Sequence, residues 1–330
     1  MNVLVVRLGA LGDIIHTLPA VAALRAAYPS ARIDWLVEAR HREILDLVPA
    51  VDRIVVVREA TMAAWLEATR QLRGARYDVA LDFQGLMKSA VLARASGAKR
   101  VLGFSIWHLR EKGARPFYSE GVDVRSTHVI HKNLRLLEAL GIERPAIEFP
   151  LLRVDSHARD TLVTQAAGAP IALINPGAAW PNKRWPAQRF GELAAFLREV
   201  RGMAPFVLWG PDEEALAREV AAASSGAARI APPTRLADVV EVCRVAALVV
   251  SGDTGPLHIA AAAGAPTVSI FGPTDPARNG SWVEEDVVIS RFESCRCHYD
   301  RRCHHAAWCL DSIGVPEVAA AVQQRLAGQW

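Results

Sequence analysis

A carboxylate follows the first apolar run of the chain. The run Val3–Arg7 leads into Leu8-Gly9-Ala10-Leu11-Gly12-Asp13, and His16 lies about one helical turn after Asp13. Glycines after a first strand can form a dinucleotide-binding turn, but G-x-G-x-x-G is absent and a carboxylate would repel a pyrophosphate. We therefore exclude NAD or FAD at this turn. Asp13 can be the N-cap of a helix or a general base, and the two roles are compatible.

The segment Asp82–Ser89 repeats this pattern, with the end of an apolar run, a glycine turn and a predicted helix. Lys88 falls in the first turn of that helix, where a cation opposes the helix dipole, so we expect an anion beside it. We interpret His16, Gln84 and Lys88 as acceptor-binding residues. The alternatives are that Lys88 is an ordinary surface lysine and that Gln84 and Asp82 only satisfy turn amides.

Two later loops favour binding of a diphosphate. Residues 175–186 read Asn-Pro-Gly-Ala-Ala-Trp-Pro-Asn-Lys-Arg-Trp-Pro. Their small residues expose backbone N–H groups beside Lys183 and Arg184, which suits an anion. A turn with two exposed bases is the alternative.

Residues 251–258, Ser-Gly-Asp-Thr-Gly-Pro-Leu-His, place Thr254 and Gly255 where a strand meets a helix N-terminus, which is an anion site. Asp253 would repel phosphates, so we expect it to bind sugar hydroxyls. The loop Phe271–Pro276 ends the next predicted strand and is expected at the same edge. An N-cap role explains Asp253 or Thr254 singly, but not the whole run.

The elements that position these loops alternate between short β-branched runs and Ala/Leu/Arg segments of helical period. This alternation predicts βα units on parallel sheets. One series lies within residues 3–103 and the other within 171–271, and we place the linker at Ile142–Pro170. With 330 residues, we predict an α/β protein of two doubly wound Rossmann-like lobes facing a cleft, residues 1–155 and 156–330.

Charge and hydropathy narrow the class of protein. The net charge is only +3, but residues 99–135 contain eight basic and three acidic residues, which suits an anionic partner as well as a solvated surface. The apolar start reaches a turn after about ten residues, too short for a membrane span, and it lacks the basic region and cleavage site of a signal peptide. We expect a cytoplasmic protein with no nucleic-acid partner.

Five motifs together resemble one family. They are G-x-L-G-D-I-I-H-T-L-P, D-F-Q-G-L-x-K-S-A, N-P-G-A…K-R-W-P, S-G-D-T-G-P-L-H and F-G-P-T-D-P, in that order across nearly the whole chain. The sequence is similar to the ADP-heptose:lipopolysaccharide heptosyltransferases, glycosyltransferase family 9. The resemblance implies the GT-B fold, an acceptor on the N-terminal lobe, a nucleotide sugar mostly on the C-terminal lobe, and inversion at the anomeric carbon without a metal ion or cofactor.

The resemblance also implies roles for single residues. Asp13 resembles the catalytic base, and the donor-binding residues would be Lys183 on the diphosphate, Thr254 and Gly255 on phosphate, Asp253 on the heptose, His258 nearby and Glu213 on the ribose, with Glu214 a possible substitute. Ala178 and Ala179 stand where some members have adjacent threonines, so those hydroxyl contacts are lost or made by backbone.

The resulting hypothesis is transfer of heptose from ADP-heptose to the anionic lipopolysaccharide inner core, either lipid A–Kdo or a heptosyl acceptor. Such an enzyme would contact the inner face of the inner membrane peripherally. One alternative is that the donor is another nucleotide sugar. The other is a non-catalytic nucleotide-sugar-binding protein, and the presence of Asp13 argues against this second alternative. The order of heptose addition, the nucleotide base and the oligomeric state stay open.

One segment lies outside these motifs. Cys295, Cys297, Cys303 and Cys309 fall within 15 residues, together with three histidines. Reduced thiols in a folded loop, a structural metal and disulfides are all compatible with this composition, although the spacing is not that of a usual zinc finger. A cytoplasmic location disfavours disulfides.

Overall fold

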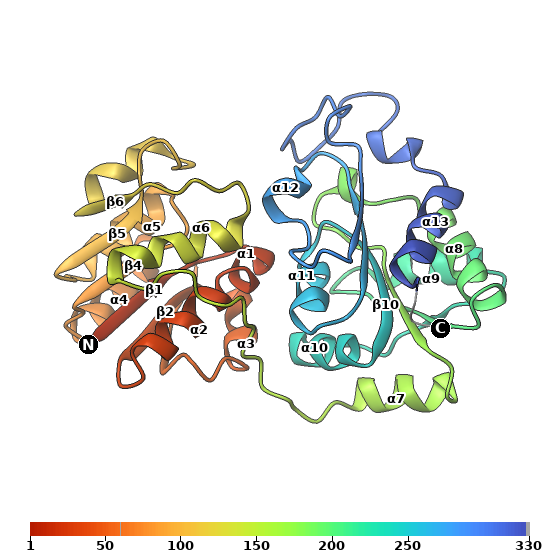
Figure 1. Cartoon of the computed structure of the whole chain (residues 1–330), viewed down its shortest axis with the longest axis horizontal. Coiled ribbons are helices and arrows are strands. Elements are labelled where there is room, and N and C mark those ends of the chain that lie inside the picture. Colours follow the sequence, from red (N-terminus) through yellow and green to blue (C-terminus); the bar gives the residue numbers. More distant parts are fainter. Residues whose placement is uncertain (60, 328–330) are drawn as a thin grey trace. The chain divides into compact units, whose positions relative to one another are not determined.

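The computed structural model describes residues 1–59 and 61–327, and the chain divides into two compact units. The first unit is Met1–Leu152 and the second begins at Arg153. Each unit contains one parallel sheet of six strands with helices on both faces (Figure 1). The observed boundary lies close to the predicted split at 155/156, and the ligands assigned to each lobe stay predictions.

The elements of the first unit alternate as predicted. Its strands are β1 (Asn2–Val6), β2 (Arg32–Glu38), β3 (Arg53–Val57), β4 (Val79–Asp82), β5 (Arg100–Phe104) and β6 (Glu120–Val122). Its helices are α1 (Leu11–Ile15), α2 (Leu18–Ala27), α3 (Arg42–Leu45), α4 (Met62–Arg73), α5 (Met87–Ala95) and α6 (Val129–Leu136), with 3-10 turns η1 (Ala39–His41), η2 (Lys112–Phe117) and η3 (Leu137–Leu140).

The second unit repeats the alternation. Its strands are β7 (Ile171–Asn175), β8 (Ala204–Val207), β9 (Arg229–Ile230), β10 (Ala246–Gly252), β11 (Thr267–Phe271) and β12 (Val287–Ser290). Its helices are α7 (His157–Ala166), α8 (Ala187–Glu199), α9 (Glu214–Ala223), α10 (Leu236–Arg244), α11 (Gly255–Ala262), α12 (Pro276–Asn279) and α13 (Val315–Arg325), with 3-10 turns η4 (Pro181–Lys183) and η5 (Cys309–Ser312).

The two sheets have the same topology. Their strand orders are β3-β2-β1-β4-β5-β6 and β12-β11-β10-β7-β8-β9. In each sheet the first three strands run from the centre to one edge, and the last three run from the centre to the other edge. In such sheets the loops after the two central strands diverge at the carboxyl edge, which leaves room for a ligand. The central strands are β1 and β4 in one unit and β7 and β10 in the other. Four of the five candidate loops follow these strands, and the fifth, Phe271–Pro276, follows β11.

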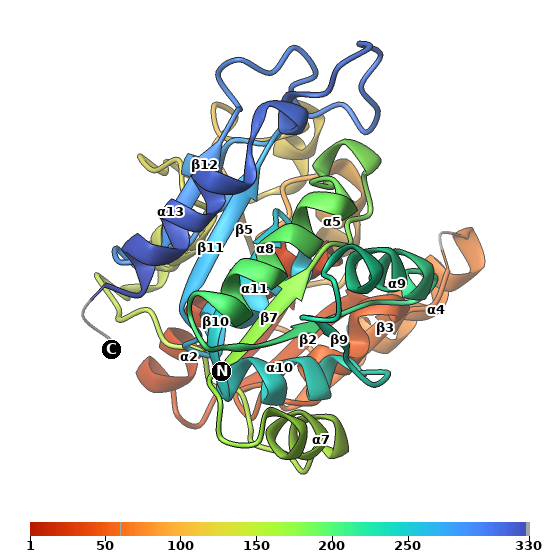
Figure 2. The ribbon, with the colours of Figure 1, turned by 90° about the vertical axis from the view of Figure 1, so that its right-hand side faces the viewer.

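Helices cover both faces of each sheet, which explains why the central strands are apolar except near their ends. In the first unit α2 packs with α6 and α4 packs with α5. In the second unit α8 packs with α9 and α13, while α10 packs with α7 and α11. Figure 2 shows α13 lying along β11 and β12. Strand β7 is consequently buried along its whole length.

The prediction of two doubly wound α/β halves is confirmed, but the predicted linker at Ile142–Pro170 is wrong in part. Helix α7 lies within that range and belongs to the second unit. Its signal is local, because Ser156 caps the helix by accepting a hydrogen bond from the Arg159 N–H at 3.2 Å. The Ser156 hydroxyl also donates to Asp238 at 2.8 Å, which ties this cap to α10.

The short edge strands β6, β9 and β12 were not predicted, because two to four residues carry too little periodicity for a strand assignment. Helices α3, α6 and α13 were also not predicted. Among the described residues, no helix is both long and apolar enough to cross a membrane.

Candidate active site

The candidate base Asp13 is held by an arginine at the end of the first strand. Asp13 is the third residue of α1, and the N-cap of that helix is Ala10, so the N-cap interpretation of Asp13 is wrong. Its Oδ1 lies 2.7 Å from Nη2 of Arg7, whose side chain is 5% exposed while that of Asp13 is 20% exposed. The ion pair fixes the direction of the carboxylate, and the Asp13 side chain stays partly exposed.

Arg7 is itself fixed by backbone groups of the sheet. Its Nη1 donates to the carbonyl of Phe83, which follows β4. Its own carbonyl accepts from the indole Nε1 of Trp35 at 3.0 Å. Gln84 completes the support, because its Oε1 accepts from the N–H of Leu8 at 2.9 Å and from that of Gly9. The loop that carries Asp13 is therefore positioned by two neighbouring strands.

Asp82 has a structural role in this loop cluster. It is fully buried, and its carboxylate accepts from the Gln84 and Gly85 N–H groups, the Ser89 hydroxyl and the Tyr118 hydroxyl. Burial raises the pKa of Asp82 in spite of these hydrogen bonds. The interpretation that Asp82 satisfies turn amides is confirmed.

The anion beside Lys88 is supplied by the protein itself. Lys88 Nζ lies 2.7 Å from Glu38 Oε1, at the end of β2. Burial acts to raise the pKa of Glu38, but the hydrogen bonds and charges of Lys88 and Arg40 together outweigh burial and lower it. The charge of Lys88 alone therefore does not require an acceptor anion.

Two histidines of this unit are withdrawn from its surface, His16 fully and His41 in part. His16 ends α1 with 1% exposure, and its carbonyl accepts from Asn133 of α6 at 3.0 Å. His41 lies against Gly9, where an added Cβ would be 2.9 Å from the imidazole ring, so Gly9 is required for this contact. Burial and the neighbouring Arg40 lower the pKa of His41 to about 4, so this ring is neutral at neutral pH.

The second unit is organised around one buried carboxylate, Asp253, which follows β10 and is 6% exposed. Its Oδ2 lies 2.5 Å from Lys183 Nζ and accepts from the Thr274 hydroxyl at 2.6 Å. Its Oδ1 accepts from the Asn279 amide at 2.7 Å and lies 3.4 Å from His258 Nε2. Four protein groups thus surround the two carboxylate oxygens.

These partners keep Asp253 charged. Burial acts to raise its pKa, but the hydrogen bonds and charges of His258 and Lys183 together outweigh burial and hold the pKa well below the ordinary value for aspartate. Lys183 in turn lies over the Trp180 ring, with Nζ 4.4 Å from the ring centroid. Asp253 and the Trp180 ring therefore hold the lysine in place before any ligand binds.

The start of α11 is free to receive an anion. Thr254 occupies the N-cap position, but its side chain makes no capping hydrogen bond. Its hydroxyl instead accepts from Asn175 Nδ2 at 3.0 Å and lies 3.2 Å from Ser251 Oγ. The first N–H groups of an α-helix have no partner within the helix, so an anion can bind at Thr254 and Gly255.

Glu213 lies beside the loop 175–186 and Glu214 does not. Glu213 Oε2 accepts from the Gly210 N–H at 3.1 Å, and its Oε1 lies 3.6 Å from Arg184. A Cβ on Gly177 would approach within 2.1 Å of the Glu213 carboxylate, so any larger residue there would displace this carboxylate. Glu214 pairs with Arg218 on the exposed side of α9.

Several residues of these sites were not identified from the sequence. Arg7 ends an apolar strand, and its position at the strand's carboxyl end was a usable signal. Thr274 lies in the loop that was expected at this edge. Nothing local distinguishes Asn279, or Glu38 and His41, because their importance arises from neighbours distant in the sequence.

Comparison with known proteins gives consistent results. Residues 65–309 match glycosyltransferase family 9 (heptosyltransferase). The chain is 32% identical over 309 residues to lipopolysaccharide heptosyltransferase 1 of Pseudomonas aeruginosa, covering 89% of this chain and 85% of the relative. It is 31% identical over 303 residues to the protein of the same name from Escherichia coli K12, covering 87% and 93%.

A solved structure shares the fold over the whole length. The E. coli heptosyltransferase WaaC with ADP-2-deoxy-2-fluoro heptose has a TM-score of 0.78 and 25% identity, covering 98% of this chain and 99% of that one. The predicted GT-B fold class is confirmed by this similarity and by the two parallel six-stranded sheets.

The network around Asp253 can be tested through stability. In the Asp253→Ala variant, Lys183 loses its carboxylate partner in a site where its side chain is only 14% exposed. We expect the free energy of unfolding to fall by about 3 kcal/mol, as for removal of one member of a buried ion pair. Denaturant titration measures the change.

The matched control is Asp275→Ala, which removes the side chain that caps α12 by accepting from the Ala277 N–H. We expect this variant to lose only about 1 kcal/mol. An Asp253→Ala variant no less stable than the control would show that the network does not hold the site together.

Proposed function

The chain belongs to glycosyltransferase family 9, the heptosyltransferases, and on that basis we propose that it transfers heptose from ADP-heptose to the lipopolysaccharide inner core. The acceptor is lipid A–Kdo or a heptosylated form of it. The names of the relatives and the ADP-heptose analogue in the WaaC structure support this assignment. The observation that carries the reaction type is the solvent-accessible Asp13 carboxylate held by Arg7.

Asp13 acts as the general base in this proposal. It takes the proton from an acceptor hydroxyl while that oxygen attacks the anomeric carbon of the donor and the ADP leaves. A single displacement of this kind inverts the anomeric configuration. Arg7 is a positioning residue, because its two hydrogen-bonding nitrogens aim the carboxylate and satisfy the Phe83 carbonyl at the same time.

The departing diphosphate is stabilised by groups of the second unit, without a metal ion. Lys183, the Thr254 hydroxyl and the Gly255 N–H supply positive charge and donors at one edge of the sheet. Preorganised donors of this kind lower the barrier because they need no reorientation as the negative charge develops. Glu213 is proposed to accept from ribose hydroxyls, since its carboxylate lies beside Gly177 in the same loop cluster.

Asp253 serves the donor site mainly by orienting Lys183 and His258. A heptose hydroxyl can bind the carboxylate only by replacing one of its four present partners, of which Thr274 and Asn279 are uncharged. Replacing an uncharged donor leaves the Lys183 ion pair intact. The proposed sugar contact of Asp253 therefore occurs through exchange with Thr274 or Asn279.

His16, Gln84 and Lys88 belong to the proposed acceptor side, with different functions. Gln84 aligns the loop before Asp13. His16 is buried and supports α1 against α6 through Asn133. Lys88 is 39% exposed beside Glu38 and can contact an anionic group of the acceptor.

Peripheral membrane contact is proposed for the surface formed by Met87, Ile106, Trp107, Arg110 and Lys112, named here the 105–113 surface. Trp107 is 81% exposed, and Ile106 and Met87 are also exposed. Arg110 and Lys112 are exposed and form no ion pair within the part of the chain that the structure describes. Exposed tryptophan beside unpaired basic residues suits an anionic lipid surface.

Substitution of Asp13 tests the proposed chemistry. With ADP-heptose and a panel of truncated lipopolysaccharides, we expect Asp13→Asn and Asp13→Ala to lower kcat by about 10²–10⁴-fold, as for loss of a general base. The affinity for ADP, measured by calorimetry, should be nearly unchanged because the donor groups lie in the second unit. Asp46→Asn, which alters only an exposed pair with Arg42, is the control.

Three results would contradict parts of this proposal. Near-normal turnover in Asp13→Ala would rule out the general base. Activity only with another nucleotide sugar would rule out the donor while sparing the chemistry. ADP binding without any transfer by the wild type would identify a non-catalytic binding protein.

The 105–113 surface can be tested by sedimentation with lipid vesicles. We expect wild type to bind phosphatidylglycerol vesicles more tightly than phosphatidylcholine vesicles. Arg110→Ala and Lys112→Ala should each weaken anionic binding about fivefold, since each basic residue near such a surface contributes about 1 kcal/mol. Trp107→Ala should weaken binding to both lipids, whereas the exposed Leu66→Ala on α4 should not. Equal binding by all variants would refute the proposed membrane contact.

A further inference from the structure

The four clustered cysteines have no part in the proposed transfer reaction. They lie in the segment 291–309, which contains no helix or strand between the end of β12 and the start of η5 at Cys309. Such a long irregular segment needs some interaction to fix it, and a large apolar core is not available to it. Cys295 and Cys297 are nevertheless buried.

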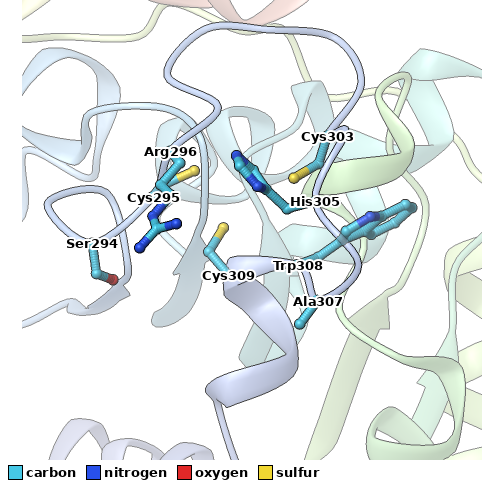
Figure 3. Close-up of a pocket in the computed structure, with 8 residues that line it drawn as sticks. All are labelled: Ser294, Cys295, Arg296, Cys303, His305, Ala307, Trp308 and Cys309. Atoms are coloured by element: carbon cyan, nitrogen blue, oxygen red, sulfur yellow. The ribbon is translucent and has the colours of Figure 1, made fainter.

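The four sulfur atoms gather in one place as two pairs. Cys297 Sγ lies 2.7 Å from Cys303 Sγ, and the thiol of Cys295 lies beside that of Cys309. Figure 3 shows the sulfurs of Cys295, Cys303 and Cys309 directed into one pocket, with Arg296 and His305 on its wall. The side chains of the cluster therefore converge from both ends of the segment.

Backbone N–H groups also point at these sulfurs. The Cys297 N–H donates to Cys295 Sγ at 3.4 Å. The N–H groups of His304 and Leu310 lie near the sulfurs of Cys297 and Cys309 and favour their charged form. Such donors stabilise negatively charged sulfur, the form in which cysteine binds a metal. A disulfide sulfur is uncharged and gains much less from them.

We propose that Cys295, Cys297, Cys303 and Cys309 form a structural four-thiolate site for a soft divalent cation of the zinc class. Four cysteines without an open position are typical of a closed, non-catalytic site. Binding releases the four thiol protons and leaves two positive charges against four negative ones. The guanidinium of Arg296, on the wall of the same pocket, offsets part of the excess negative charge.

Metal binding requires a small rearrangement of the cluster. Within the described residues, no three His, Cys, Asp or Glu side chains are already arranged to hold a metal ion. Tetrahedral metal–sulfur bonds of about 2.3 Å place the sulfurs about 3.8 Å apart, so Cys297 and Cys303 must separate by about 1 Å. The irregular backbone of 291–308 permits this movement without breaking a helix or strand.

The site would brace the loops of the second unit that carry the proposed donor groups. Asn182, beside Lys183, donates to the carbonyl of Asp300 at 3.0 Å. The Tyr299 N–H donates to the carbonyl of Pro273, beside Thr274, at 2.9 Å. Fixing the cysteine segment therefore also fixes Lys183 and Thr274, the two partners of Asp253 Oδ2. That this supports donor binding rests on the proposed function of those loops.

Metal content of the full chain tests the proposal directly. The protein is purified in buffers that contain no chelator and no added metal ion. We expect elemental analysis to find about one divalent ion per chain. After removal of the ion, titration with Co²⁺ should give the sulfur-to-cobalt charge-transfer absorption of thiolate coordination. Alkylation of the four cysteines should be slow with the ion and fast without it.

Variants identify the ligands independently of transferase activity. Cys297→Ser and Cys303→Ser should lose the ion, whereas Cys243→Ala, in α10, and His305→Ala should retain it. Because a cysteine variant can fail to fold, the Co²⁺ spectrum of the wild type is the decisive measurement. Intact-mass analysis showing Cys297–Cys303 and Cys295–Cys309 disulfides, an absence of bound metal with no Co²⁺–thiolate spectrum, or loss of metal in His305→Ala would overturn the four-thiolate site.

The same preparations measure the link to the donor site. Removing the ion should weaken ADP binding several-fold and lower the thermal unfolding temperature. Metal binding without any ADP binding would refute the proposed function but leave the metal site standing. A wild-type protein that binds ADP but cannot be loaded with any divalent ion would refute the metal site and leave the proposed function standing.

Discussion

The second unit depends on the placement of one ionised carboxylate away from water. An isolated charge at the position of Asp253 would be strongly unfavourable, and Lys183 with three further donors makes it stable there. These donors come from a turn after β7, from α11 and from the loop after β11. Because Asp253 needs these donors and they need its carboxylate, the three segments are held together at one edge of the sheet. The geometry proposed for the donor follows from that constraint.

The first unit also holds a carboxylate in a fixed position, but Asp13 is less buried than Asp253. Asp13 must stay accessible to take a proton, so it cannot be enclosed as Asp253 is. Arg7 fixes the direction of the Asp13 carboxylate, and Arg7 is itself held where the end of β1 meets the loop after β4. One carboxylate is therefore a partly exposed group proposed to react and the other a buried organiser, with 20% and 4% of their side-chain surface exposed.

Both arrangements use the same property of a doubly wound parallel sheet. The chain leaves the two central strands in opposite directions, so the loops after β1 and β4, and after β7 and β10, open a space at the carboxyl edge. Polar residues can occupy that edge without disturbing the apolar strands. The cysteine segment is a different device, since it adds order to an irregular stretch beside the loops of β7 and β11.

The sequence by itself determined the alternation of strands and helices and the location of Asp13, Lys183 and Thr254 in the segments that follow strand ends. These features are local, because side-chain periodicity and glycine turns are encoded within a few residues. Only the tertiary structure decided that Asp13 pairs with Arg7 instead of capping α1, that Lys88 pairs with Glu38, and that Asp253 is enclosed by Lys183, His258, Thr274 and Asn279. Partner choice depends on burial and on the direction of side chains from distant strands, which the local pattern does not contain.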